Sequence, residues 1–288
     1  MRIDLILLLF NRPEHTKNVL EGLKRNGIKN LRAYLDFSSK PADLIKQNKI
    51  LKIINNFDGI NIDLIQRKEN FGLAKSVTKS LDEVFDDGAE AAVLLEDDCV
   101  LIENGFSFFE QGLHQLKDNK QIRSLCGYTF PSRNLVFDYD SDILLLSRFS
   151  SWGWGTWADR WVQYEGDYKK VIQLIDSIHL KIEDFAPDID IVRKSPKYLN
   201  GEADVWSINW ILLHYITSTF AVFPRESVIS NIGLDGSGVN CENTDVFITT
   251  NKRISENIYK FDKLQYFPEN ENTIRKFMAE HGLKTYSV

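Results

Sequence analysis

The 288-residue chain is poor in cysteine, long apolar runs and excess positive charge, and each shortage excludes a class of protein. Its three cysteines, Cys99, Cys126 and Cys241, are too few and too scattered for a disulfide framework or a zinc site. Their odd number favours a reducing compartment, and we expect small buried hydrophobic side chains. The net charge of -6 argues against a nucleic-acid partner, because phosphate binding favours a basic surface.

The sequence also lacks membrane-spanning segments and the motifs of common nucleotide-binding folds. The apolar run at residues 5–10 is too short for a membrane span, and it lacks the cationic start and cleavage site of a signal peptide. We therefore expect a cytoplasmic protein. The sequence has no G-x-G-x-x-G after its first apolar run and no Walker A loop, which disfavours dehydrogenases and NTPases. The five histidines show no metal-ligand spacing, and His214 is expected to be a packed core or surface residue.

The most informative stretch is residues 91–98, in which five apolar residues precede Glu96, Asp97 and Asp98. An unbroken apolar run predicts a strand buried on both faces, since a strand with one wet face would alternate. Carboxylates packed at its end repel one another unless a cation or a hydrogen-bonding ligand offsets the repulsion. The stretch therefore suggests a site for a divalent metal and a nucleotide, although acidic residues after strands also serve as solvated turns or helix caps.

Strand and helix patterns alternate before this stretch, which predicts an α/β fold with a mostly parallel central sheet flanked by helices. We expect strands at 3–10, 31–37, 60–65 and 91–95, and helices at 13–26, 43–57 and 73–85. Further on, we expect a helix at 106–116, strands at 122–128 and 143–149, an amphipathic helix at 203–215, and strands at 220–223 and 228–232. Residues 1–250 are assigned to one domain, with a nucleotide-binding half at 1–130, a helix-rich half at 131–250 and a C-terminal extension at 251–288.

Polar side chains follow each of the first four predicted strands. Asn11 and Arg12 follow the first strand, Asp36 ends the second, and the loop 67–75 follows the third. Because the carboxyl ends of parallel strands meet at one edge of a sheet, we expect these groups to converge with the acidic triplet. A nucleotide needs such a set, with an acid or amide for the base or ribose and cationic donors for phosphate.

Four short motifs occur in a specific order along residues 1–245: Leu-Phe-Asn-Arg-Pro at 9–13, Glu-Asn-Phe-Gly-Leu-Ala-Lys at 69–75, Glu-Asp-Asp at 96–98 and Ser-Trp-Gly-Trp-Gly-Thr-Trp at 151–157. In this arrangement the chain resembles a GT-A glycosyltransferase, with the acidic triplet as its D-x-D equivalent. The nearest resemblance is to bacterial family 2-like sugar transferases, and the triplet is similar to that of inverting N-acetylglucosaminyltransferases that act on N-glycans.

The resemblance implies a Rossmann-like GT-A fold and a donor site on the first half of the chain. It implies that Asp98 binds Mn2+ or Mg2+, while Glu96 and Asp97 contact the ribose or sugar hydroxyls of the donor. The other residues implied at the donor are Phe10, Asn11, Arg12, Asp36, Asn70 and Lys75. Among these, Asp36 would face the base, whereas solvated surface charge remains the alternative for Arg12 and Lys75.

The tryptophan-rich motif has two interpretations. Indoles such as those of Trp152 and Trp154 stack on the apolar faces of sugar rings, and the intervening glycines let the backbone approach a ligand. Large aromatic residues are also common in cores, so a core loop packed by these rings is the alternative. The resemblance favours at least one of the rings at the donor or acceptor sugar.

Inverting transfer requires a general base that takes the proton of the acceptor hydroxyl. The resemblance places this acid after the tryptophan-rich motif, where Asp204 is the first candidate and Glu202 the second. Capping of a helix N-terminus is the alternative role of both carboxylates. Related enzymes often carry a histidine within the region 231–241, where this chain has Asn240 instead.

The sequence thus predicts a metal-dependent inverting glycosyltransferase that moves a sugar, with a UDP-sugar as the expected donor, to a hydroxyl of a glycan or lipid-linked glycan. We expect a role in bacterial surface polysaccharide or glycoconjugate synthesis at the inner face of the membrane, without nucleic acid as a partner. A sugar nucleotidyltransferase and a non-catalytic glycan- or nucleotide-binding module remain alternatives. The sugar, the acceptor and the oligomeric state stay open.

Overall fold

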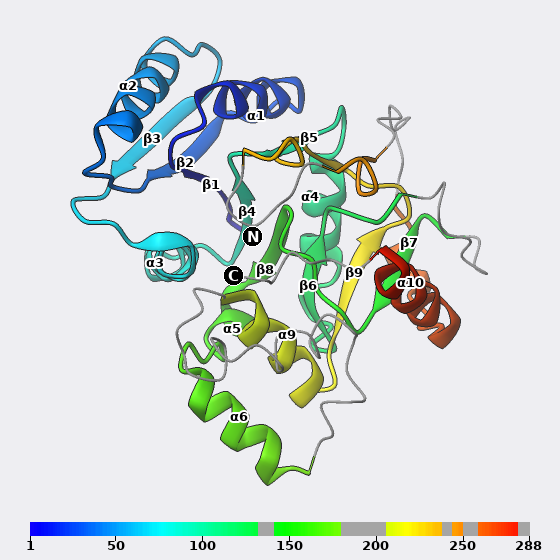
Figure 1. Ribbon diagram of the computed structural model, residues 1–288. Coiled ribbons are helices and arrows are strands. Elements are labelled where there is room, and N and C mark those ends of the chain that lie inside the picture. Colours follow the sequence, from blue (N-terminus) through cyan, green and yellow to red (C-terminus); the bar gives the residue numbers. More distant parts are fainter. Residues whose placement is uncertain (132–140, 180–205, 238–243, 250–258, 282–288) are drawn as a thin grey trace.

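The computed structural model describes residues 1–131, 141–179, 206–237, 244–249 and 259–281 (Figure 1). Within them, the central sheet has the strand order β3-β2-β1-β4-β8-β6-β9-β7. Its first half is parallel and consists of β1 (Ile3–Leu9), β2 (Asn30–Leu35), β3 (Asn61–Gln66) and β4 (Ala91–Glu96). The carboxyl ends of these four strands therefore lie along one edge of the sheet.

The second half of the sheet has mixed strand directions. It consists of β6 (Ile122–Cys126), β7 (Ile143–Leu146), β8 (Trp154–Trp157) and β9 (Phe220–Pro224). Strand β8 runs antiparallel between β4 and β6, β9 is parallel to β6, and β7 is antiparallel to β9. Two short strands, β5 (Cys99–Leu101) and β10 (Ile229–Asn231), form a separate antiparallel pair directly after the acidic triplet.

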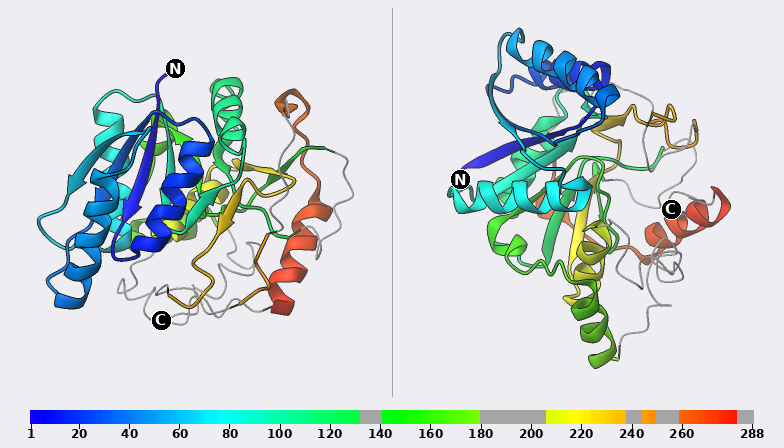
Figure 2. Two further views of the ribbon diagram at one scale, coloured as in Figure 1. Left: turned by 90° about the horizontal axis from the view of Figure 1, so that it is seen from above. Right: turned by 60° about the vertical axis from the view of Figure 1, so that its left-hand side comes forward.

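Helices cover both faces of the sheet. Helices α1 (Pro13–Arg25) and α2 (Pro41–Asn55) pack side by side on one face, and α3 (Gly72–Asp86) lies with α9 (Trp206–Ile216) on the other (Figure 2). The remaining helices are α4 (Phe106–Gln115), α5 (Ala158–Trp161), α6 (Tyr168–Ser177), α10 (Pro268–His281) and the 3-10 turn η3 (Phe261–Lys263). The architecture is α/β with a large, mostly parallel sheet flanked by helices, which confirms the predicted fold class.

Local sequence explains where the first helices begin and end. Pro13 and Pro41 occupy the first helical positions of α1 and α2, where a missing N–H costs no intrahelical hydrogen bond. Gly27 follows α1 with φ of 72°, a left-handed conformation that glycine adopts without a steric penalty. The strands and helices predicted up to residue 96 are all present, with ends displaced by a residue or two.

One prediction about the second half is wrong, and one interpretation left open is corrected. The helix expected to be amphipathic is buried on nearly every side in its described part, α9, because it lies between the sheet and other helices. Residues 154–157, for which a core loop was one of two interpretations, lie in the core but form the central strand β8. Gly155 permits this pairing, since a Cβ there would lie 3.1 Å from the carbonyl oxygen of Ala92 on β4.

The described cysteines and the C-terminal segment belong to the packed core. Cys99 and Cys126 are buried free thiols, as predicted, whereas Cys241 lies outside the described residues. Helix α10, within the predicted extension, packs Phe277 against Phe130 and Phe247 with ring centroids 5.5 and 5.8 Å apart. No helix in the described ranges combines the length and the hydropathy that crossing a bilayer requires.

Candidate functional site

The carboxyl ends of β1 and β4 bring a guanidinium and two carboxylates together. Arg12, at the start of α1, donates from Nη1 to Oδ2 of Asp98 at 2.8 Å and from Nη2 to Oδ1 of Asp97. The Arg12 side chain is 17% exposed, and both aspartates are buried. Because β1 and β4 are neighbouring parallel strands, this contact follows directly from the sheet order.

One guanidinium leaves the acidic triplet incompletely satisfied. Oδ2 of Asp97 is buried and has no hydrogen-bond partner among the described residues. Burial raises the pKa of Asp97 although Arg12 opposes the shift, and burial with the charges of Asp98 and Asp97 raises the pKa of Glu96. The triplet therefore favours additional positive charge or hydrogen-bond donors.

The segment 231–237 covers this cluster from the side of β10. The backbone N–H of Ile232 donates to the carbonyl oxygen of Asp98 at 2.9 Å. A Cβ at Gly233 would lie 2.2 Å from Oδ2 of Asp98 and 3.1 Å from Nη1 of Arg12, so only glycine fits without moving the ion pair. Sequence reasoning noted the glycine content of this region but missed Gly233, because its constraint is a contact between distant parts of the chain.

His15 joins the same segment to helix α1. Its Nε2 lies 3.2 Å from the carbonyl oxygen of Ile232 and 3.4 Å from Oδ2 of Asp235. These contacts place residues 232–235 beside the first turn of α1, next to Arg12. His15 was not among the predicted site residues, since no spacing rule connects it to Asp235.

Asp36 organises the loop that precedes α3. Its Oδ1 accepts from the backbone N–H of Phe71 and its Oδ2 from that of Gly72, at 2.9 and 3.0 Å. Phe71 is the N-cap of α3 and provides no side-chain cap of its own, so Asp36 satisfies N–H groups at this helix end from the neighbouring strand. Asn70 continues the connection by donating from Nδ2 to the carbonyl oxygen of Phe37 at 2.7 Å.

The remaining predicted donor residues lie around this edge. Asn11 donates from Nδ2 to Oδ1 of Asp43 at 2.7 Å, and Phe10 is half-buried at the end of β1. Lys75 is exposed, pairs with Glu69 at 2.8 Å and lies 3.8 Å from the centre of the Phe71 ring. The structure thus joins Arg12 directly to the acidic triplet and arranges Asp36, Asn70 and Lys75 along the neighbouring β3–α3 loop.

The two predicted tryptophans differ in accessibility. Trp154 has no exposed surface and stacks on Trp206 with ring centroids 5.1 Å apart. Trp152 is half-buried and packs edge-on against Tyr128 at 4.5 Å. The structure therefore places Trp154 in the core, whereas part of the Trp152 side chain remains exposed to solvent.

Three predicted positions cannot be located here. Asp204, Glu202 and Asn240 lie outside the described residues. Their proposed roles stay predictions.

The carboxylates fit a metal ion only if other ligands complete its coordination. Among the described residues, no group of three His, Cys, Asp or Glu side chains forms a metal site. Asp97 and Asp98 nevertheless provide carboxylate oxygens, and one of them lacks a hydrogen-bond partner. Magnesium-type ions in nucleotide sites commonly take one or two carboxylates and complete their shell with phosphate and water oxygens. The two carboxylates fit an ion of that kind.

The chain is similar in fold to many solved structures, two of which are nucleotide-sugar enzymes. No protein-family model and no curated protein sequence matches the chain. A mannosyltransferase from Pyrobaculum calidifontis, in complex with GDP-Man and Mn2+, is similar at a TM-score of 0.39 and 10% identity, over 54% of this chain and 44% of that one. A UDP-glucose pyrophosphorylase from Acinetobacter baumanii is similar at a TM-score of 0.40 and 9% identity, over 78% and 86%. The chain spans less than half the length of the mannosyltransferase.

Proposed function

We propose that this chain is a metal-dependent, inverting GT-A glycosyltransferase that uses a nucleoside-diphosphate sugar, with a UDP-sugar as the expected donor. The observation that carries the proposal is the contact of Arg12 with Asp97 and Asp98 at the carboxyl ends of adjacent parallel strands. This edge of an open α/β sheet is where ligands bind, and a diphosphate needs both a cationic donor and a metal-binding carboxylate. The acceptor would be a hydroxyl of a glycan or lipid-linked glycan in surface polysaccharide or glycoconjugate synthesis.

The residues of the cluster have distinct proposed roles. Asp98 would hold Mn2+ or Mg2+, which when bound supplies Lewis-acid stabilisation of the leaving nucleoside diphosphate. Arg12 orients both aspartates and opposes the protonation of Asp97. The unsatisfied Oδ2 of Asp97 is suited to accept from a hydroxyl of the ribose or sugar.

Further proposed roles follow from position along the same edge. Asp36, Phe10, Asn11, Asn70 and Lys75 would border the base and the diphosphate, as the order of the strand ends suggests. Glu96 would contact donor hydroxyls together with Asp97. Trp152, which keeps some exposure, is the better candidate of the two tryptophans for a sugar ring.

Transfer would proceed by a single displacement. Asp204 is the proposed general base, with Glu202 as the second candidate, and takes the proton of the acceptor hydroxyl as its oxygen attacks the anomeric carbon. The bond to the nucleoside diphosphate breaks in the same step, so no covalent enzyme intermediate is needed. A sugar nucleotidyltransferase would use a glycine-rich basic loop after the first strand, and residues 10–13, Phe-Asn-Arg-Pro, do not provide one.

A thermal-shift screen of UDP, GDP, CDP and dTDP sugars with and without Mn2+ tests the proposal. We expect the sugars of one nucleotide to raise the melting temperature only when Mn2+ is present, because a ligand that binds the native state stabilises it. Asp98→Asn should abolish the shift, whereas Asp159→Asn, at a surface ion pair with Lys120, should keep it. Slow donor hydrolysis should be lost in Asp204→Asn while the shift remains. Absence of any shift would contradict the donor site.

A further inference from the structure

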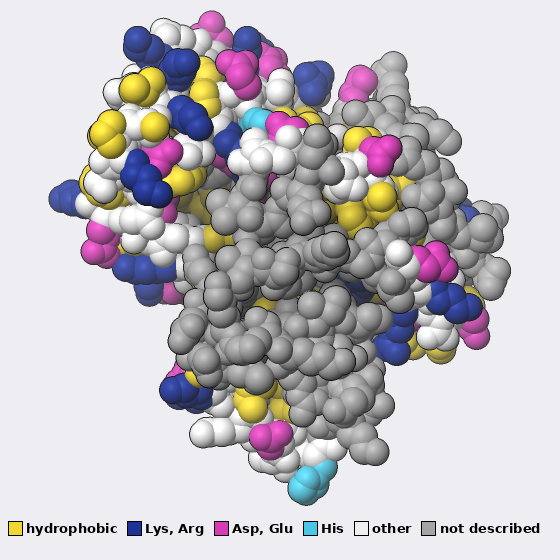
Figure 3. Space-filling model, viewed as in Figure 1, with side chains coloured by type: hydrophobic (Ala, Val, Ile, Leu, Met, Phe, Trp, Pro, Cys, Tyr) yellow, Lys and Arg dark blue, Asp and Glu magenta, His cyan; other side chains and the backbone are white. Residues whose placement is uncertain are grey.

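Helix α2 presents an unusual outward surface. Ile45 is 62% exposed and Leu44 is 41% exposed in its first turns, and Phe37, just before the helix, is 37% exposed. Figure 3 shows hydrophobic side chains among Lys and Arg side chains on this part of the molecule, at the upper left. Apolar side chains of this size on a surface are informative when they cluster.

The helical period places lysines around the apolar side chains. Ile45, Lys49 and Lys52 have the spacing i, i+4 and i+7, so they form one outward stripe along α2. Lys46 is exposed on the flank of this stripe, and the exposed Lys40 immediately precedes the helix. The face therefore combines an apolar end, near the carboxyl edge of the sheet, with a cationic stripe.

Lysines outnumber acidic side chains on this face. The acidic residue of α2 is Asp43, whose carboxylate accepts from Asn11 and Ser38 at 2.7 and 2.9 Å and lies within electrostatic range of Lys40 and Lys46. No ion pair within the described ranges involves the lysines at 40, 46, 49 and 52, whereas Lys75 and Lys79 on α3 pair with acids. The chain as a whole carries a net charge of -6, so the positive charge of this face is opposite in sign to that of the whole chain.

We infer that the outward face of α2, together with Phe37, docks on an anionic phospholipid bilayer. Apolar side chains of an interfacial helix enter the headgroup region while lysines attract anionic lipids, and the α2 face supplies both. A nucleic acid would engage the lysines but would give no role to exposed Ile45 and Leu44. The two kinds of side chain together therefore favour a lipid surface.

The docking face lies beside the candidate donor site. Phe37 directly follows Asp36, and its carbonyl oxygen accepts from Asn70 in the β3–α3 loop. A bilayer bound at α2 would hold this edge of the sheet near the membrane, where a lipid-linked acceptor would be found. That last link rests on the proposed function, whereas the docking surface itself rests on the side chains of α2.

Helix α6 supplies a matched control within the same molecule. It also exposes two aliphatic side chains, Leu174 and Ile178 directly after its last turn, each 43% exposed. Lys169 and Lys170 are exposed there as well, but Asp167 and two further acids, Glu165 and Asp176, share the segment. The α6 surface thus has the same residue types without the net positive charge.

Co-sedimentation of the full chain with vesicles tests the inference. We expect binding to vesicles of phosphatidylcholine mixed with phosphatidylglycerol, weakening with added salt, and little binding to phosphatidylcholine alone. The triple substitution Lys46→Gln, Lys49→Gln and Lys52→Gln should weaken binding about 100-fold. The double substitution Leu44→Gln and Ile45→Gln should weaken it about tenfold.

Controls separate this inference from its alternatives. Lys169→Gln with Lys170→Gln, and Leu174→Gln with Ile178→Gln, should leave vesicle binding unchanged. Equal loss in these α6 variants, or no binding by the unmodified chain, would overturn the inference. If only the lysine substitutions mattered, the face would be a general polyanion surface and the lipid assignment would be wrong. Nucleotide-induced thermal shifts, measured without vesicles on the same α2 variants, report on the donor site independently.

Discussion

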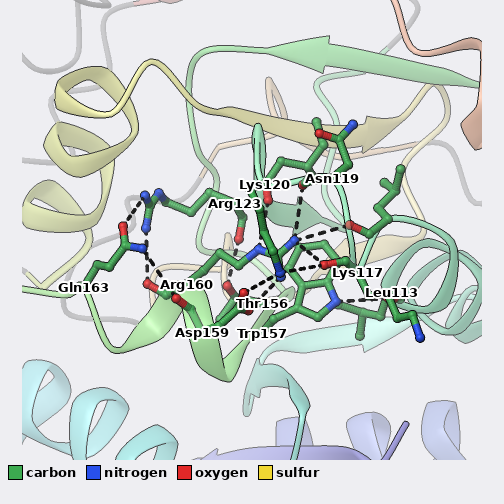
Figure 4. Close-up of polar contacts among 12 residues, drawn as sticks. Leu113, Lys117, Asn119, Lys120, Arg123, Thr156, Trp157, Asp159, Arg160 and Gln163 are labelled. Carbon is green, nitrogen blue, oxygen red and sulfur yellow. Dashed lines mark hydrogen bonds and ion pairs between the residues drawn. The ribbon is translucent and has the colours of Figure 1, made fainter.

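The two halves of the central sheet both bury charged side chains, but they satisfy them differently. In the mixed half, Arg160 is 3% exposed and donates to the carbonyl oxygens of several residues and to Asp159 (Figure 4). These carbonyls belong to Leu116, Lys117, Asn119 and Ile122. Arg123 beside it donates to Thr217, Thr219, Gln163 and the carbonyl oxygen of Arg160.

In the parallel half, the buried cluster contains more carboxylates than cations, and one of its oxygens lacks a hydrogen bond. Three carboxylates lie at the end of β4, Arg12 contacts two of them, and Oδ2 of Asp97 has no hydrogen bond within the described residues. Buried polar groups in folded proteins are almost always satisfied, so a shortfall of this kind fits a water, an ion or a ligand at the site. The comparison separates a structural cluster, completed by protein groups, from a candidate site in which one carboxylate oxygen has no partner among the described residues.

Loss of a carboxylate from the incomplete cluster should have the largest effect on activity. Asp98→Asn is expected to lower donor turnover about a thousandfold, which corresponds to ~4 kcal/mol, because the metal would lose its protein ligand. The free energy of unfolding should change much less than turnover, because reduced repulsion within the triplet offsets the weakened contact with Arg12. Steady-state kinetics and urea unfolding measure both quantities. If Asp98→Asn lost stability and kept turnover, the cluster at β4 would be structural and the proposed metal site would be wrong.

Loss of the arginine from the complete cluster should instead affect folding. Arg160→Met removes the guanidinium hydrogen bonds to four carbonyl oxygens and to Asp159, so the free energy of unfolding should fall by ~3 kcal/mol. Lys120→Met is the control, because Lys120 is largely exposed and contacts the same Asp159. Urea unfolding should show almost no change in that variant. A similarly small change in Arg160→Met would mean that water replaces the guanidinium there.

The close contact at Gly233 should matter for donor binding more than for folding. Gly233→Ala places a Cβ against Asp98 and Arg12 and should weaken the affinity for the nucleoside diphosphate about tenfold, or ~1.4 kcal/mol. Gly166→Ala is the matched control, since its Cβ would meet only a Tyr164 ring carbon at 3.7 Å. Isothermal titration calorimetry with the nucleoside diphosphate selected by the thermal-shift screen measures the affinity of both variants. Equal affinities in the two variants would show that the 231–237 segment moves freely away from the site.

A further prediction concerns the acid stability of the mixed half, where the effect is small near neutral pH and grows as the pH falls. His214 is fully buried, contacts Ser124 at 3.0 Å, and burial lowers its pKa from 6.5 to about 3. The unfolded chain therefore binds a proton that the fold excludes, and stability is lost as the pH falls below 6.5, by up to ~1.4 kcal/mol per pH unit. His214→Gln should flatten this part of the pH profile of urea unfolding. His114→Gln, at an exposed position of α4, should leave it unchanged.

Much of the first half of the chain was predictable because its signals are local. Buried parallel strands appear as unbroken apolar runs, prolines and glycines bound the helices, and strand order brings the strand ends to one edge. Residues 91–98 accordingly formed β4 with the acidic triplet at its end. The residues of β8 gave no such signal, since its strand conformation comes from pairing with β4 and β6 on either side.

Sequence alone determined the alternation of strands and helices in the first half and the place of the acidic triplet, because each depends on near neighbours in the chain. Tertiary structure decided which groups meet: Arg12 with Asp97 and Asp98, Gly233 against that ion pair, and the burial of Trp154. It also decided that Arg123 and Arg160 find their partners within the protein, whereas Oδ2 of Asp97 has none among the described residues. Contacts between distant segments depend on three-dimensional packing, which no local pattern encodes.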